Sequence, residues 1–200
     1  MSKKISKGTT VLLVAGVVVL FLIGGTLTTY NGLVAKDEAV STAWGDIQSQ
    51  YQRRSDLVPN LVSTVKGYAK HESSTLESVV AARARATQIT VDADDLTPEK
   101  MRSIQAAQGE LSQAIGRLLA VTENYPELKA NENFSELQAQ LEGTENRINE
   151  SRQKFNAVVQ NYNVSVRRFP ASIVAGLFGF EKKEKFEAEP AAQTAPKVEF

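Results

Sequence analysis

Residues 11–23 read VLLVAGVVVLFLI, an unbroken apolar run inside a stretch, residues 8–35, that contains no charged side chain. About twenty helical residues, each rising about 1.5 Å, cross the roughly 30 Å hydrocarbon core of a bilayer. The segment from Thr9 to Thr29 has this length, so it is predicted to be a transmembrane helix, and residues 1–8 a short cytoplasmic N-terminus. After Tyr30 the chain is polar and periodic, which predicts a single anchor followed by one water-exposed domain.

A cleaved secretory signal also combines basic residues with an apolar run. The residues after the run, GGTLTTY at 24–30, form a poor cleavage pattern, which favours an uncleaved anchor. Lys3, Lys4 and Lys7 precede the span, whereas Lys36 is the one basic residue within about twenty residues after it. Because basic residues are retained in the cytoplasm, we expect a single-pass protein whose N-terminus is cytoplasmic and whose C-terminal domain is extracytoplasmic.

Composition limits the chemistry of the domain. The chain has 23 basic and 23 acidic residues and no cysteine. A domain without a basic block lacks the cationic surface that nucleic-acid-binding proteins need, so no nucleic-acid partner is expected. Without cysteine, disulfides and thiolate chemistry are excluded. Residues 30–169 are rich in Ala, Glu, Gln, Arg and Leu, which is typical of helices.

Apolar residues recur every three or four positions from residue 40 onward, as on one face of a helix. The first stripe continues in phase across Pro59, so either one helix kinks there or two helices meet, and the phase favours the kink. A break is expected at residues 69–75, where Ser74 and Glu77 have capping-box spacing, and a second helix then runs to about Ile89. The first stripe comprises Val40, Trp44, Ile47, Tyr51, Val58, Leu61, Val65 and Tyr68.

Two further helices are expected after a loop at residues 92–98. Thr97 and Pro98 suit the N-cap and first position of the third helix. The fourth is expected to open at Asn133 and to end before Pro170, with the stripe Phe134, Leu137, Leu141, Ile148, Phe155, Val159, Tyr162, Val166 and Phe169. These patterns predict an all-α fold: an antiparallel four-helix up-and-down bundle behind one N-terminal transmembrane helix.

Residues 170–200 differ from the bundle. The apolar segment 173–180 (IVAGLFGF) is too short to span a membrane, and it can dock on the bundle, lie on the membrane or bind a partner. The following EKKEKFEAE and AEPAAQTAP stretches are typical of flexible chain. Val198 and Phe200 give the chain end the pattern that PDZ-type domains capture, so they are candidate partner-binding residues. The alternative is that Phe200 packs on the bundle or is a frayed end.

Several clusters of residues are specific in their order and spacing, among them residues 53–61 (RRSDLVPNL), 125–131 (YPELKAN), 144–148 (TENRI) and 178–180 (FGF). Together these clusters resemble the LemA family. The resemblance covers residues 30–200 and implies an N-terminally anchored bacterial cell-membrane protein with a LemA-like bundle. It implies no reaction, cofactor or catalytic residue, and some members are linked with membrane quality-control proteases or membrane biogenesis.

Motifs for metal or phosphate chemistry are incomplete. His71 and Glu72 begin like a zinc-protease H-E-x-x-H motif, but Thr75 replaces the second histidine. The acidic loop around Asp92 lacks the glycine and glutamate of a calcium loop. No catalytic, cofactor-binding or metal-binding residue is therefore predicted, and the chain is not expected to be an enzyme.

Polar residues beside two of the stripes form a candidate network. If the first and fourth helices are neighbours, these side chains can fix the helix register through charge-assisted hydrogen bonds, or they can bind a ligand or partner. The structural role is the preferred interpretation. The candidates are Arg53, Arg54, Asp56, Asn60, Glu145, Asn146 and Arg147, with Glu142 and Arg152 nearby.

The sequence favours a membrane-anchored, non-catalytic scaffold or adaptor at the bacterial cell envelope, with a possible link to membrane protein quality control. Its expected partners are the lipid bilayer and an unidentified protein, such as a membrane protease or a PDZ-type domain. Two alternatives stay open. One is a carboxylate-dependent hydrolase, which needs paired, perturbed carboxylates in a pocket. The other is a self-assembling membrane-associated homo-oligomer.

Overall fold

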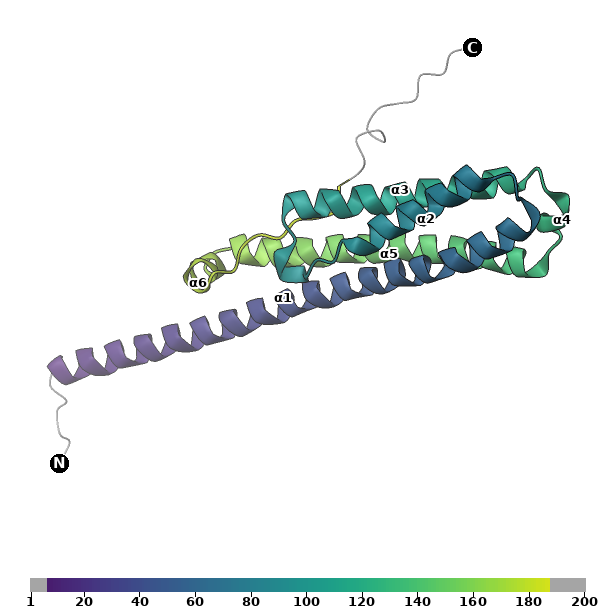
Figure 1. The fold of residues 1–200 in the computed structure, drawn as a ribbon. Coiled ribbons are helices and arrows are strands. Elements are labelled where there is room, and N and C mark those ends of the chain that lie inside the picture. The colour runs from purple at the N-terminus through teal and green to yellow at the C-terminus, as the bar shows by residue number, and fades with distance from the viewer. Residues whose placement is uncertain (1–6, 188–200) are drawn as a thin grey trace, which may run out of the picture. The chain divides into compact units, whose positions relative to one another are not determined.

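A computed structural model describes residues 7–187, and within that range every regular element is a helix (Figure 1). The prediction of an all-helical chain with one apolar N-terminal helix is thus confirmed. Residues 1–6 and the candidate partner-binding residues Val198 and Phe200 lie outside the described range. The helices are α1 (Lys7–Tyr68), α2 (Ser73–Gln88), the 3-10 helix η1 (Ala93–Asp95), α3 (Pro98–Thr122), α4 (Pro126–Lys129), α5 (Glu132–Arg167) and α6 (Ala171–Phe178).

The chain divides into two compact units. Unit 1 contains the chain up to Ala39 together with Gln160–Lys182, and unit 2 contains Val40–Val159 with the chain from Lys183. Helices α1 and α5 each contribute one part to both units. The two units are described separately below.

Unit 2 is built around one hydrophobic core to which α1, α2, α3 and α5 all contribute. Leu61, Val79, Leu111 and Leu141 represent these four helices in the core. Burying each such side chain contributes about 1.5–3 kcal/mol of transfer free energy. The amphipathic stripes read from the sequence therefore face one another.

Contacts across unit 2 fix the directions of its helices. Residue numbers rise along α1 as they fall along α5: the Trp44 and Phe155 ring centroids are 5.8 Å apart, Arg54 bonds Glu145, and Tyr68 accepts a hydrogen bond from Asn131, just before α5. The same order relates α2 to α3, since Arg85 bonds Glu110, and Tyr125, just beyond α3, donates to Glu72, just before α2. Neighbouring helices in these pairs are consequently antiparallel.

Helix α1 continues without interruption through Pro59. Proline has no N–H, so the carbonyl of Ser55, four residues earlier, loses its usual helical partner. In the structure Arg83 Nε from α2 donates to this carbonyl at 2.8 Å. A side chain on the neighbouring helix thus replaces the missing bond, and Pro59 is not a helix boundary.

Two of the predicted helix starts differ from the structure. Thr97 caps α3 as expected, because its Oγ1 accepts a hydrogen bond from the Lys100 N–H at 3.3 Å. The predicted capping box at Ser74 is wrong, since the N-cap of α2 is Glu72, two residues earlier, and it makes no side-chain capping bond. Helix α5 opens before Asn133, with Asn131 Oδ1 accepting from the Phe134 N–H at 3.1 Å.

Most stripe residues are buried; Leu137 is half-buried, and two residues at helix ends are exposed. Tyr68 is 41% exposed and Phe169 is 77% exposed. Each stands at or beyond the last turn of its helix, where fewer neighbours remain to cover it. The prediction that these two rings belong to the core is therefore wrong.

Residues 183–187, in unit 2, are held by one buried residue, although the sequence composition suggested a flexible stretch. Phe186 is only 9% exposed and lies against Trp44 and Phe155, with ring centroids 6.1 and 5.5 Å away. The side chain of Asn156 holds its backbone by accepting from the Phe186 N–H and donating to the Phe186 carbonyl, both at 2.9 Å. One aromatic residue anchors this segment to unit 2.

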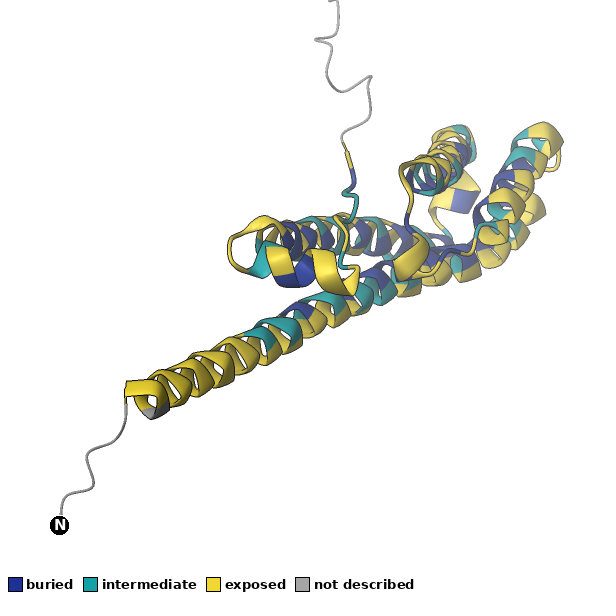
Figure 2. Cartoon of the chain, turned by 90° about the vertical axis from the view of Figure 1, so that its left-hand side faces the viewer, coloured by how far each residue is buried: buried dark blue, intermediate teal, exposed yellow. Residues whose placement is uncertain are grey.

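In unit 1, the N-terminal part of α1 is long and apolar enough to cross a membrane, and none of its most apolar window is buried. Figure 2 shows this part of α1 as exposed along its length. Its side chains include Val11, Leu20 and Phe21, which are 67%, 70% and 83% exposed. Such a surface is costly in water, because every exposed apolar side chain forfeits its burial energy.

Candidate functional site

Arg54 is the centre of the polar network in unit 2. It is 1% exposed, although charged residues are almost never buried unless paired. One terminal nitrogen donates to Glu145 Oε2 at 2.7 Å and to Ser112 Oγ at 2.5 Å. The other donates to Gln108, to Oε1 at 2.5 Å and to the carbonyl at 3.1 Å. Arg54 therefore ties α1 to both α3 and α5.

The two charges of this ion pair have different surroundings. The Arg54 side chain is 2% exposed, whereas the Glu145 side chain is 40% exposed. A carboxylate that water reaches keeps part of its hydration, so the cation bears most of the desolvation cost. The hydrogen bonds to Gln108 and Ser112 offset part of that cost, although Arg54 Nε has no hydrogen-bond partner among residues 7–187.

Tyr51 and Arg152 extend the network along α1 and α5. Arg152 donates to the Tyr51 hydroxyl through Nε at 3.1 Å and through a terminal nitrogen at 3.0 Å, and its guanidinium lies 5.2 Å from the Phe186 ring centroid. Burial raises the pKa of Tyr51 above its ordinary value, while the nearby Arg152 and Arg54 act in the opposite direction. Tyr51 is consequently neutral at physiological pH and keeps its proton.

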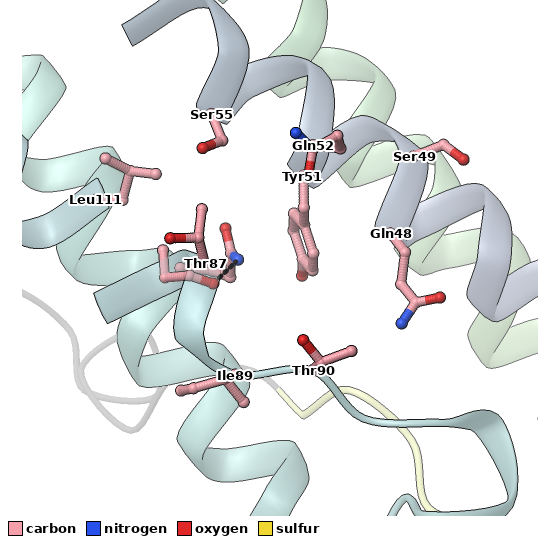
Figure 3. A pocket seen from close by; sticks show the side chains of 11 residues that line it. Gln48, Ser49, Tyr51, Gln52, Ser55, Thr87, Ile89, Thr90 and Leu111 are labelled. Atoms are coloured by element: carbon pink, nitrogen blue, oxygen red, sulfur yellow. Dashed lines mark hydrogen bonds between the residues drawn. The ribbon is translucent and has the colours of Figure 1, made fainter. Parts of the chain in front are cut away.

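A polar groove of about 530 Å³ lies beside the network, between α1 and the end of α2. Figure 3 shows Gln48, Tyr51 and Thr90 around it. The side chain of Ser55 also lines the groove, and its buried hydroxyl has no hydrogen-bond partner among residues 7–187. A buried, unsatisfied hydroxyl costs about 1–3 kcal/mol.

The chemistry available to the groove is hydrogen bonding. Its lining consists of amides, hydroxyls, one phenol and aliphatic side chains, from residues Gln48, Ser49, Tyr51, Gln52, Ser55, Ala86, Thr87, Ile89, Thr90, Gln108 and Leu111. General acid–base catalysis uses groups that titrate near the working pH. None of these lining groups ordinarily does.

The seven residues of the candidate network do not all meet. Arg54 and Glu145 come together, but the other five have exposed side chains on the surface of unit 2. Asp56, for example, bonds Gln52 on its own helix at 2.7 Å. The exposed residues are Arg53, Asp56, Asn60, Asn146 and Arg147.

Sequence reasoning missed Gln108 and Ser112 on α3, which supply three of the bonds to Arg54. The signal available was a polar residue on an apolar face. Gln108 lies between Ile104 and Leu111 at helical spacing and is itself buried. A buried glutamine in such a position needs a partner on another helix.

The motifs that suggested metal chemistry lie apart from the groove residues. His71 is exposed in the turn between α1 and α2. Asp94 accepts from Lys183 at 3.1 Å, and Asp95 is paired with Lys100. Within the described part of the chain, no three His, Cys, Asp or Glu side chains gather as a metal site would require.

These observations define the class of protein: an all-helical membrane-type protein that combines an exposed apolar helix with a helical core organised by a buried arginine. The model of the LemA family matches residues 43–200, and the chain belongs to this family, as the sequence resemblance predicted. The matched region includes Arg54 and Glu145, as well as the groove.

Relatives with established names extend the comparison. Magnetosome protein MamQ of Magnetospirillum gryphiswaldense is 27% identical over 187 residues, which cover 84% of this chain and 68% of the relative. Magnetosome protein MamQ 2 of Paramagnetospirillum magneticum is 26% identical, covering 88% of this chain and 71% of its own. Protein LemA of Metamycoplasma hominis is 23% identical over 72% of this chain and 63% of its own length.

Proposed function

We propose that this protein is a non-catalytic scaffold or adaptor, held in the bacterial cell envelope by α1, that binds a protein partner through the groove of unit 2. One observation carries the proposal: Arg54, the most deeply buried charge among residues 7–187, binds side chains of α3 and α5 through both terminal nitrogens, while the groove beside it offers uncharged hydrogen-bonding groups. The bonds of Arg54 hold the helices together, and the groove can bind a partner by hydrogen bonds. Membership of the LemA family supports it.

The carboxylate-hydrolase alternative has less support. A carboxylate that acts as an acid or base needs a partner carboxylate or a perturbed environment in a pocket. Glu145 is instead engaged by Arg54, and also lies 3.4 Å from the Ser112 hydroxyl. Its role in this proposal is to hold the cation.

The occupant that the groove suits is an uncharged polar segment of a protein chain. Peptide amides both donate and accept hydrogen bonds, as do the glutamine and hydroxyl groups of the lining. Gln48 Nε2 already donates to the Val91 carbonyl at 3.0 Å, so the groove side chains are partly preoriented. A charged ligand would find no compensating charge in this lining.

The proposed topology places residues 1–8 in the cytoplasm and the rest of the chain after the span outside it. Alkaline phosphatase fused after Phe200 is active outside the cytoplasm only, so the fusion should be active. A matched β-galactosidase fusion should be inactive. Activity of the β-galactosidase fusion instead would reverse the orientation.

An adaptor role, for example in membrane protein quality control, is tested by crosslinking in native membranes. A photoreactive amino acid is placed at Thr90 in the groove and, as a control, at Val80, which is 51% exposed on α2. The Thr90 protein should form one defined adduct with an envelope protein, and Ser55→Leu, which fills the groove, should abolish it. The Val80 protein should not form this adduct.

Two results would refute the proposal. One is an equal adduct pattern at Thr90 and Val80, which would show that the groove is not the binding surface. The other is a hydrolytic activity of the purified full-length protein that Glu145→Gln removes without unfolding it. An adduct between two copies of this chain would identify the partner as a second copy and favour self-assembly.

A further inference from the structure

Helix α6 in unit 1 has an exposed apolar side that the function proposed above does not use. Its sequence, ASIVAGLF, contains no charged residue. Val174 and Ala175 are buried at 7% and 1% exposure, but Ile173 and Leu177, one turn apart, are 56% and 74% exposed. Phe169 precedes Ile173 by the same spacing and is 77% exposed. Ile173 and Leu177 therefore face outward together on α6, and Phe169, in the turn before the helix, adds a third exposed apolar side chain.

Contacts within unit 1 place α6 beside the end of the apolar segment of α1. The Tyr30 ring lies 4.8 Å from the Phe178 ring and 5.7 Å from the Phe180 ring, measured between centroids. A cavity of about 390 Å³ is lined by Thr29 and Gly32 of α1 and also by Phe169. Thr29 is the last residue of the predicted span, so α6 is at the level of the predicted membrane boundary.

The direction of α6 suits a membrane surface. Figure 1 shows α6 nearly end-on, while α1 runs across the picture, so α6 lies across α1 rather than along it. A helix that crosses a transmembrane helix in this way can present one side to the membrane surface. Gly179, with φ of 76°, ends α6 in the left-handed conformation that favours glycine. The chain can therefore turn back from the surface directly after Phe178.

Basic residues surround the apolar side. Arg167 and Arg168 precede α6, and Lys182 follows it. Arg168 and Lys36 line the same cavity as Thr29, and Lys36 donates to the Ser165 hydroxyl there. Lys36 is seven residues beyond Thr29, or about 10 Å along the helix axis. This is the depth of the headgroup layer, where basic side chains meet lipid phosphates.

We propose that α6 is a membrane-surface helix whose exposed apolar side enters the interface of the bilayer that α1 crosses, with Lys36 and Arg168 contacting lipid phosphates. This inference rests on the proposed insertion of α1. An apolar side flanked by arginines and lysines is the pattern of helices that lie in the interface. The continuity of its surface with the exposed apolar surface of α1, through Tyr30, identifies the lipid bilayer as the occupant.

The test uses the full-length protein in vesicles of phosphatidylcholine and phosphatidylglycerol. Because the sequence has no cysteine, single cysteines can be introduced and labelled with an environment-sensitive fluorophore. The positions are Leu177→Cys on α6, Val19→Cys in the apolar segment and Val80→Cys on α2, which are 74%, 53% and 51% exposed. Quenching by a lipid carrying a spin label is compared with quenching by aqueous iodide.

The expected ratio of lipid to iodide quenching at Leu177 is at least about five-fold above that at Val80 and approaches that at Val19. Ile173→Asp, one turn away, should lower the Leu177 ratio by about half or more while leaving the Val19 ratio unchanged. If Leu177 matches Val80 while Val19 is lipid-quenched, the inference about α6 is wrong and the anchor stands. If Val19 is also quenched by iodide, the proposed anchoring itself fails.

Two further outcomes distinguish other occupants and the lipid charge. Shielding of Leu177 from both quenchers would mean that protein covers α6, which overturns the inference. Repeating the measurement for Arg168→Gln in anionic and in pure phosphatidylcholine vesicles tests the basic residues. The substitution should lower the Leu177 ratio in anionic vesicles only, and an equal loss in both would refute the phosphate contact.

Discussion

Replacing Glu145 by glutamine removes one charge from the Arg54 network and keeps the shape of the side chain. A hydrogen bond to a charged group contributes about 1.5–3 kcal/mol. The Glu145 side chain is 40% exposed, so water compensates part of the loss, and the lower half of this range applies. We expect Glu145→Gln to lower the free energy of unfolding by about 2 kcal/mol.

The matched control is the pair of Arg85 and Glu110, whose side chains are 53% and 45% exposed. Exposed pairs contribute about 0.2–1 kcal/mol, and salt screens them. Glu110→Gln should therefore have a small effect that disappears in about 0.5 M NaCl. The effect of Glu145→Gln should persist there, because its cation is buried.

The assay is urea unfolding of the full-length protein in detergent, followed by circular dichroism and by the fluorescence of Trp44. With a urea dependence of about 2 kcal/mol per molar, the expected shift of the midpoint is about 1 M. If Glu145→Gln has no larger effect than Glu110→Gln, or loses its effect in salt, then Arg54 is hydrated and the account of the network is wrong.

Three further predictions follow from unit 2. Trp44→Ala should lower the free energy of unfolding by about 3–5 kcal/mol, because the ring is buried and its indole N–H donates to the Val91 carbonyl at 2.9 Å. A loss below about 1 kcal/mol would place the ring at the surface. Asn156→Ala should speed hydrogen exchange at the Phe186 amide by at least about five-fold while leaving the amides of α3 unchanged, since it removes both bonds to that backbone. Because burial raises the pKa of Tyr51, the folded state holds this proton more tightly than the unfolded chain does. The free energy of unfolding should thus be constant through neutral pH and fall above about pH 10, and Tyr51→Phe should reduce that fall in a pH series of urea titrations.

Hydrophobic periodicity predicted the helices well, because a stripe must be buried wherever it lies in the fold. The positions Val40, Ile47 and Leu61 in α1 and Ile148 and Val159 in α5 are all buried as expected. Periodicity says little about chain ends, where coverage depends on neighbours that a single helix does not specify. For this reason Tyr68 and Phe169 were assigned to the core incorrectly.

The polar site was harder to predict, because two of the residues that bind Arg54 lie on α3, whereas the charged residues that suggested the site lie on α1 and α5. Arg54 and Glu145 stand out by their charge, whereas Gln108 and Ser112 are uncharged, and the one signal was the position of Gln108 on the apolar face of α3. Phe186 was missed for a related reason. A single aromatic residue in a charged stretch gives no periodic signal, and its burial depends on Asn156, which is 30 residues away.

The bond from Arg83 to the Ser55 carbonyl has a consequence for the order of folding. An isolated peptide containing residues 40–68 lacks Arg83, so its helix would leave that carbonyl to water beside Pro59. The two halves on either side of the proline can nucleate separately, but they gain a continuous bonding pattern only when α2 packs against them. Arg83 and Ser55 are 28 residues apart in sequence. The hairpin of α1 and α2 is therefore the smallest unit that can form the helix around Pro59 cooperatively. The completion of the longest helix therefore depends on the helix that follows it.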